Sequence, residues 1–231
     1  MPWAMGHCSQ VTSSLPAAQA DLAGADSYVI FLTGQPVGRE EVAVTREPDG
    51  WVLRGSSRVS PPIATTVRRV EVHYDANWRP RSLSLEGAIQ DKEVGLETTF
   101  ADGKATNILK EDDATTEKID DVSADAVVLP NVFFGSYAAL AARLVDATPG
   151  TEIKAYIAPQ AEIPIVVVAV ADERIDTPKR AFTAKRFTLT FRNPSGELTT
   201  NLWIEPNGRF VRLSVPAQTL EIARDDVASA A

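Results

Sequence analysis

The sequence has few of the residues that build covalent and metal-bound sites. It contains one cysteine, Cys8, and two histidines, His7 and His73. A single cysteine cannot form an internal disulfide, so cysteine content does not indicate the compartment. Two separated histidines and one cysteine supply too few of the three or four ligands that a zinc site takes. We therefore expect no metal site in this chain.

The motifs of common enzymes and cofactor-binding proteins are also missing. The sequence has no G-x-S-x-G nucleophile elbow and no G-x-G-x-x-G or P-loop pattern. Its acidic stretch from 111 to 125 lacks calcium-loop spacing, so we expect a surface connection there. His73 alternates with Val72 and Tyr74, and a histidine in such a strand is more often a surface or packed residue than a general base. We expect no cofactor and no catalytic residue, although the composition leaves open an enzyme that uses two carboxylates.

Long apolar runs and an excess of positive charge are absent too. No run approaches the roughly 18 residues that cross a bilayer as a helix, so we expect no transmembrane segment. The formal net charge is −8 and the pI is about 4.9. Such a surface repels phosphate backbones, which argues against a nucleic-acid partner. The 44% hydrophobic and 23% charged content is that of an ordinary globular protein.

Three segments follow from composition along the chain. Residues 1–26 are rich in Ala, Ser, Gln and Pro without a period, and we expect a flexible N-terminal tail. Cys8 in this tail has no apolar stretch before it, which argues against lipidation. Residues 27–224 are expected to form a single antiparallel β domain, and residues 225–231 a C-terminal tail or linker.

What the sequence does have is a series of strand patterns separated by turns. Turn signals stand at Asp49-Gly50, Asp102-Gly103 and Asn207-Gly208. The run from 165 to 168 has no polar face, which is typical of a central strand covered on both sides. We predict a mainly β fold: a curved antiparallel sheet, half-barrel or open barrel, of about ten or more strands. The expected strands cover 28–33, 37–46, 51–54, 68–74, 81–86, 93–100, 104–109, 153–158, 163–171, 180–192, 198–205, 209–215 and 219–224.

One segment has helical spacing instead. Phe133, Tyr137, Leu140 and Leu144 recur at the period of a helix, after Asn131 as a candidate N-cap. We predict one amphipathic helix near 131–145, packed on the sheet. Across this helix the chain has a faint internal echo, since 74–83 and 204–213 both read strand, turn, basic residue, strand. Either a duplicated hairpin or convergence of short hairpins accounts for it.

The arrangement of these hairpins resembles that of bacterial envelope proteins. The segments that carry the resemblance are 34–38, Asp49-Gly50-Trp51 and 202–212. They resemble uncharacterised envelope or secreted β domains in the style of the LolA/LolB lipoprotein carriers, in which a curved sheet is closed by a helix. The chain is also similar to the all-β region before the catalytic domain of some secreted α/β hydrolases. Neither resemblance supplies a catalytic residue.

Aromatic side chains provide the candidate site. Between sheet and helix they either fill the core or line a concave apolar cavity. The candidate ligand-binding residues are Trp51, Phe100, Phe133, Phe134, Tyr137, Phe187, Phe191 and Trp203.

Besides the free-standing enzyme that uses carboxylates, which is the weakest of the hypotheses, two functions remain open. The first is a non-catalytic binding or scaffold domain, periplasmic or extracellular, whose partner is an apolar small molecule, a lipid or another envelope protein. The second is an accessory domain that partners a secreted serine-hydrolase domain outside this chain. We favour the first, because no nucleophile and base are paired in the sequence.

Overall fold

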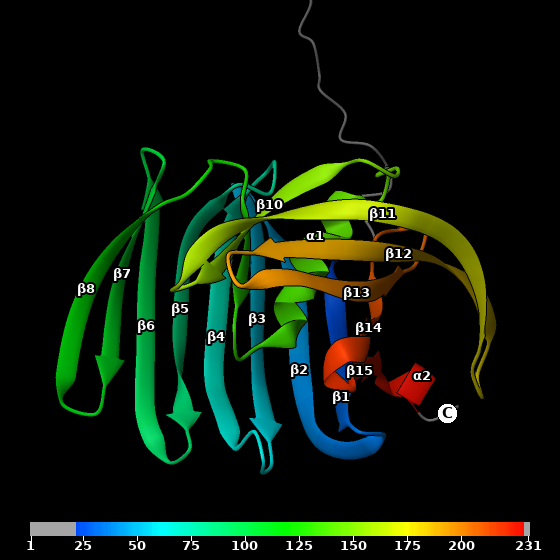
Figure 1. Ribbon diagram of the computed structural model, residues 1–231, viewed down its shortest axis with the longest axis horizontal. Helices are drawn as coiled ribbons and strands as arrows, with labels where there is room; N and C mark the ends of the chain where they lie inside the picture. The colour runs from blue at the N-terminus through cyan, green and yellow to red at the C-terminus, as the bar shows by residue number, and fades with distance from the viewer. Residues whose placement is uncertain (1–21, 229–231) are drawn as a thin grey trace, which may run out of the picture.

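The computed structural model describes residues 22–228, so most of the expected N-terminal tail lies outside it. Its strands form one sheet (Figure 1). The strands are β1 (Gly24–Leu32), β2 (Gln35–Glu47), β3 (Gly50–Val59), β4 (Thr65–Asp75), β5 (Pro80–Ile89), β6 (Lys92–Ala101), β7 (Lys104–Glu111), β8 (Ala114–Asp121), β9 (Val127–Pro130), β10 (Glu152–Ala158), β11 (Ala161–Asp176), β12 (Ala181–Asn193), β13 (Gly196–Ile204), β14 (Phe210–Val215) and β15 (Leu220–Arg224). The helical elements are η2 (Phe134–Ser136), α1 (Tyr137–Leu144), η3 (Pro216–Gln218) and α2 (Asp225–Ala228).

The fifteen strands follow a simple order. It runs β8 to β1 and then β15 to β9, so that each half of the sheet is a meander of consecutive strands. Every neighbouring pair is antiparallel except β9 and β10, which are parallel. The two meanders join through β1 and β15, where Tyr28 pairs with Arg224 and Leu32 with Leu220. The expected curved, open antiparallel sheet with one short packed helix is confirmed.

Helix α1 lies between the two meanders. In Figure 1 strands β11 to β13 pass in front of it, and β2 and β3 pass behind it. Its Leu140 and Leu144 are fully buried, and α1 contacts β9, β13 and β14. We call the sheet face that packs around α1 the inner face and the opposite one the outer face. In the described part of the chain, no helix is long and apolar enough to cross a membrane.

The outer face of the first meander is polar because strand residues alternate between faces. Glu71 on β4 sits among basic side chains there. It pairs with Arg54 at 3.0 Å, Arg69 at 3.0 Å and His73 at 2.6 Å. His73 is therefore a partly exposed outer-face residue, 39% accessible at its side chain, and belongs to a surface ion-pair group.

The turn predicted at Asp102-Gly103 is confirmed, and the turn predicted at Asp49-Gly50 is displaced by one residue. Asp102 and Gly103 both have positive φ, +50° and +74°, as the expected two-residue hairpin turn requires. At Asp49-Gly50 the prediction is wrong by one residue, because Gly50 already belongs to β3 and pairs with Glu47. A Cβ on Gly50 would lie 1.9 Å from the carbonyl oxygen of Tyr74, so close backbone approach requires the glycine there.

Two strand expectations need correction. The stretch from 111 to 125, expected to be a surface connection, contains the whole of strand β8, which is the exposed edge of the sheet. The run from 165 to 168 is not covered on both sides, since Val168 is 53% exposed. The β11–β12 register shifts between Val167 and Ala169, and this bulge turns Val168 outward.

The C-terminal segment expected as a tail or linker from residue 225 forms α2 in its described part. Val227 of α2 packs on the outer face against a second apolar cluster, separate from the main core. The other buried members of this cluster are Ala184, Trp203, Val211 and Ala223. Residues 229–231 lie outside the described part of the chain.

Candidate ligand-binding site

A cavity of about 430 Å³ opens at one end of the inner face. It lies where the start of α1 meets the β10–β11 turn, the β12–β13 turn and η3. Its aliphatic wall is formed by Leu129, Ile157, Ile163, Leu198, Val215 and Leu220. This volume falls within the roughly 300–1,000 Å³ of small-molecule sites in proteins.

Three of the eight predicted aromatic residues line this cavity: Phe134, Tyr137 and Phe191. Tyr137 is the first residue of α1, and its ring centroid lies 6.3 Å from that of Phe191 on β12. It also lies 6.4 Å from the ring of Phe210 on β14. Burial raises the pKa of Tyr137, so its phenol stays neutral at physiological pH.

The start of the helix is fixed by a residue from the other meander. Glu40 of β2 is buried, and its Oε1 accepts the N–H of Phe134 at 3.1 Å while Oε2 accepts the N–H of Gly135 at 2.7 Å. These two bonds hold the first turn of η2, and with it Phe134 and Tyr137, against the sheet. Burial raises the pKa of Glu40 to about 8, although both N–H groups oppose that rise.

The predicted boundary of the helix is therefore wrong at its N-terminal end. The helical segment begins with η2 at Phe134, and α1 itself spans Tyr137–Leu144 instead of 131–145. Asn131 is not the cap. Since Glu40 is far from this segment in sequence, no local pattern identifies it as the group that accepts the N–H bonds.

Polar side chains in this cavity are neutral. The set at its rim and floor comprises Asn131, Gln160, Asn193, Ser195, Thr200 and Gln218. Thr200 is 1% exposed, and its Oγ1 has no hydrogen-bond partner among residues 22–228. A buried hydroxyl without a partner is costly, and in this lining the hydroxyl of Thr200 is such a group within the described residues.

The site predicted from the sequence does not include Thr200 or Leu198, although the strand pattern indicates both. Leu198, Thr200 and Leu202 alternate on β13 and pair with Phe191, Leu189 and Phe187 of β12. Because directly opposite residues share a face, the apolar run on β12 assigns these β13 residues to the inner face. Because threonine is polar, the pattern of apolar residues alone does not assign Thr200 to the inner face.

Four of the other aromatic candidates fill the core and do not line the cavity. Trp51 stacks on Trp78 with ring centroids 5.1 Å apart. Phe133 is 1% exposed and Phe187 is fully buried. Phe100 is partly buried and meets Tyr156 edge-on at 5.8 Å.

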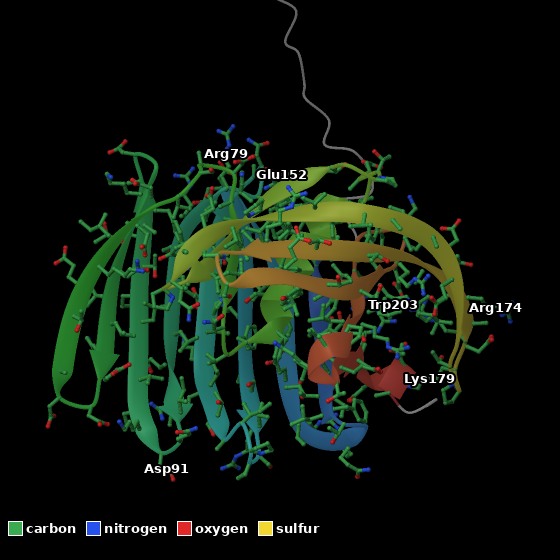
Figure 2. The ribbon with its side chains drawn as sticks, viewed as in Figure 1. Arg79, Asp91, Glu152, Arg174, Lys179 and Trp203 are labelled. Atoms are coloured by element: carbon green, nitrogen blue, oxygen red, sulfur yellow. The ribbon has the colours of Figure 1, made fainter. Side chains whose placement is uncertain are left out.

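Trp203, the last of the eight, lies on the outer face. It pairs with Arg186 of β12 and packs in the same cluster as Val227 of α2, and Figure 2 shows it beside that helix. The guanidinium of Arg212 lies 4.8 Å from its ring centroid. Its neighbour Leu202 faces the core, so the strand's alternation separates Trp203 from the cavity.

A second groove, of about 800 Å³, lies on the outer face beside α2. Its arginines are engaged by carboxylates: Arg39 by Asp225, Arg180 by Glu205, Arg209 by Asp26 at 2.7 Å, and Arg224 by Asp226 at 2.7 Å. These pairs account for the arginines of the groove, which link α2, the β11–β12 hairpin and the sheet. The smaller inner cavity is therefore the better candidate for a ligand.

Comparison with known proteins gives only a distant likeness of fold. No family model matches the chain, and no curated protein does. Among solved structures, a DUF1089 family protein from Pseudomonas aeruginosa has a TM-score of 0.44 and 15% identity, and the match covers 78% of this chain and 90% of that one. A protein inferred to be exported, with a YmcC-like fold, from Bacteroides fragilis has a TM-score of 0.29 and 9% identity, with 87% and 93% covered. At these values neither match carries an argument about ligand or activity.

Proposed function

We propose that this protein is a non-catalytic bacterial envelope protein that holds an apolar, lipid-like molecule in the inner-face cavity, in the manner of the LolA/LolB carriers. The single observation that carries the proposal is the cavity itself. About 430 Å³ of space lies beside Phe134, Tyr137 and Phe191, in a wall of aliphatic side chains. Apolar pockets of this size with a few polar groups are the usual form of small-molecule sites.

The chemistry of the lining favours binding over catalysis. Among the described residues that line the cavity, Tyr137 is the one with an ionisable side chain, and burial raises its pKa further. General acid–base catalysis works best with a group whose pKa lies near the operating pH. The periplasmic or extracellular location belongs to the proposal and rests on the sequence resemblance to envelope proteins. The accessory-domain alternative stays a prediction.

The test fills the cavity and measures binding. N-phenyl-1-naphthylamine, an uncharged apolar dye, should bind the purified protein saturably with one dye per chain and brighten. Leu198→Trp places an indole in the cavity wall and should weaken dye binding by about tenfold or more, the equivalent of about 1.4 kcal/mol.

The matched control is Leu109→Trp. Leu109 is also partly buried, but it lies on β7 and does not line the cavity. This variant should bind the dye like the original protein, with circular dichroism confirming that both variants fold. Absence of saturable binding, or equal binding by the Leu198→Trp variant, would contradict the proposed function.

A further inference from the structure

We infer that the cavity selects uncharged ligands: an apolar molecule whose polar group is a hydroxyl or another neutral hydrogen-bonding group, and neither a fatty-acid anion nor a phospholipid. This inference rests on the proposed function and names its ligand class. Its basis is the composition of the wall, because no Asp, Glu, Lys, Arg or His among residues 22–228 lines the cavity.

The absence of charge singles out this cavity within residues 22–228. Charged residues make up 23% of the chain, and other hollows of the described molecule contain them. The outer-face groove has Arg39 and Lys179. A hollow near the β6–β7 turn has Arg81 and Lys104, and one across β5–β7 has Glu86. A lining without charge is therefore a property of this site and not of the whole surface.

Two charged side chains flank the turn that carries Gln160, but neither is available to a ligand. The ammonium of Lys118 donates to the carbonyl oxygens of Pro159 at 3.0 Å and Gln160 at 2.6 Å. The carboxylate of Glu162 accepts bonds from the backbone N–H and the hydroxyl of Ser123, at 2.5 and 2.8 Å. Neither of these two side chains therefore offers a free charge to an ionised headgroup in the cavity.

The polar groups that are available suit a neutral partner. The Thr200 hydroxyl can donate one hydrogen bond and accept others, and it has no protein partner in the described chain. Side-chain amides at Asn131, Asn193 and Gln218 offer both donors and acceptors at the rim. A ligand hydroxyl can satisfy these groups in both directions. A carboxylate would lose its hydration without an ion-pair partner, which is costly in an apolar site.

The test compares two ligands of equal chain length. Dodecanol and dodecanoate should be titrated against bound N-phenyl-1-naphthylamine near pH 7, where a carboxyl group is ionised. Dodecanol should displace the dye at concentrations at least about tenfold lower. Equal or better displacement by dodecanoate would overturn the inference while the proposed function stands. If the dye does not bind at all, the proposed function itself fails.

Two variants test whether the preference for uncharged ligands arises in this cavity. Thr200→Val removes the hydroxyl at nearly constant volume and should weaken dodecanol binding about threefold to tenfold. Thr65→Val, the same change at a buried position outside the cavity, should leave it unchanged.

Gln218→Lys adds a cation at the exposed rim on η3 and should shift the preference toward dodecanoate by about tenfold. Since Gln218 is exposed, this substitution should not disturb folding. A preference that stays the same in both the Thr200→Val and Gln218→Lys proteins would also overturn the inference.

Discussion

The β4–β5 loop and the β13–β14 loop have the same backbone geometry but fill the space beside α1 in opposite ways. In the β4–β5 loop, the N–H of Asp75 donates to the carbonyl of Arg79 at 2.8 Å, and the N–H of Trp78 donates to the carbonyl of Asp75 at 3.1 Å. Trp78 has a positive φ of +61°. Its ring then folds inward and stacks on Trp51.

The second loop repeats these bonds residue by residue. The N–H of Glu205 donates to Arg209 at 2.9 Å, and that of Gly208 donates to Glu205 at 2.8 Å. Gly208 stands where the first loop has Trp78, and its φ is also positive, +89°. The sequence echo thus extends to the backbone, whether it arose by duplication or by convergence.

The two equivalent positions face one helix. Trp78, Gly208 and Ala138 of α1 together line a small void of about 20 Å³. On one side the indole fills the space, whereas on the other a Cβ on Gly208 would lie 2.8 Å from the side chain of Val145, the residue directly after α1. A loop of fixed geometry can therefore either supply the filling side chain or make room for a helix.

The largest effect is expected from Trp78→Ala. Trp78 is 3% exposed, and removing a buried large aromatic side chain costs about 3–5 kcal/mol. Chemical denaturation should show this loss in the free energy of unfolding. Asn77→Ala, an exposed change in the same loop, is the control and should cost under about 1 kcal/mol. If Trp78→Ala lowered the free energy of unfolding as little as the control does, the indole would not stabilise the packing on this side of the helix.

Gly208→Ala tests the other side of the comparison. The added methyl group meets Val145, and the residue must keep a left-handed backbone. Together we expect a cost of about 2–4 kcal/mol in the free energy of unfolding. Gly34→Ala has a similar positive φ but nothing within 4 Å of the added Cβ, so it measures the backbone part alone. Equal losses in the two variants would show that helix contact contributes nothing.

The acidic residue that starts each loop provides a third test. Asp75 Oδ1 accepts hydrogen bonds from the N–H groups of Asn77 and Arg79, so it stabilises the loop that it begins. Glu205 instead accepts a bond from the buried Arg224 at 2.9 Å. Glu205→Gln should therefore cost about 1–3 kcal/mol, because Arg224 loses part of its charge compensation.

The Asp75→Asn variant serves as the matched control. Its amide oxygen can still accept both N–H bonds, so we expect a cost below about 1 kcal/mol by denaturation. A larger loss at Asp75 than at Glu205 would reverse this assignment of roles.

Glu40, which links η2 to the first meander, should make the free energy of unfolding depend on pH. The change expected per pH unit is the smallest of these effects. The Glu40 pKa of about 8 lies above the ordinary glutamate pKa of 4.5, so between these two pH values the folded protein holds a proton that the unfolded chain releases. The stabilising contribution is complete below pH 4.5 and is lost as pH rises through 8. The free energy of unfolding should fall by up to about 1.4 kcal/mol per pH unit in this range.

Glu40→Gln removes this titration, and the difference between the two proteins should decrease as pH rises. A difference that stays constant between pH 4.5 and 8 would mean that Glu40 is anionic throughout this range, held so by the N–H groups of Phe134 and Gly135.

The sheet could be predicted from the sequence because its signals are local. Alternation and turn pairs such as Asp102-Gly103 act within a few residues. The cavity was harder to predict from the sequence, because its position depends on which strand face meets the helix. Trp203 and Leu202 are adjacent and both apolar, yet one faces α2 and the other the core. The bulge at Val168 and the cap from Glu40 likewise depend on strand pairing and contacts that are distant in sequence.

The single junction between the meanders has a consequence for how the chain reaches its fold. Within each meander, most neighbouring strands are also neighbours in sequence and can pair early, but β1 must wait for β15, which follows every other strand of the described sheet in sequence. Until then both strands are open edges that can pair with other chains. The β1–β15 seam should therefore form late in folding, and a chain that ends before Leu220 would expose an unpaired β1 edge and tend to aggregate.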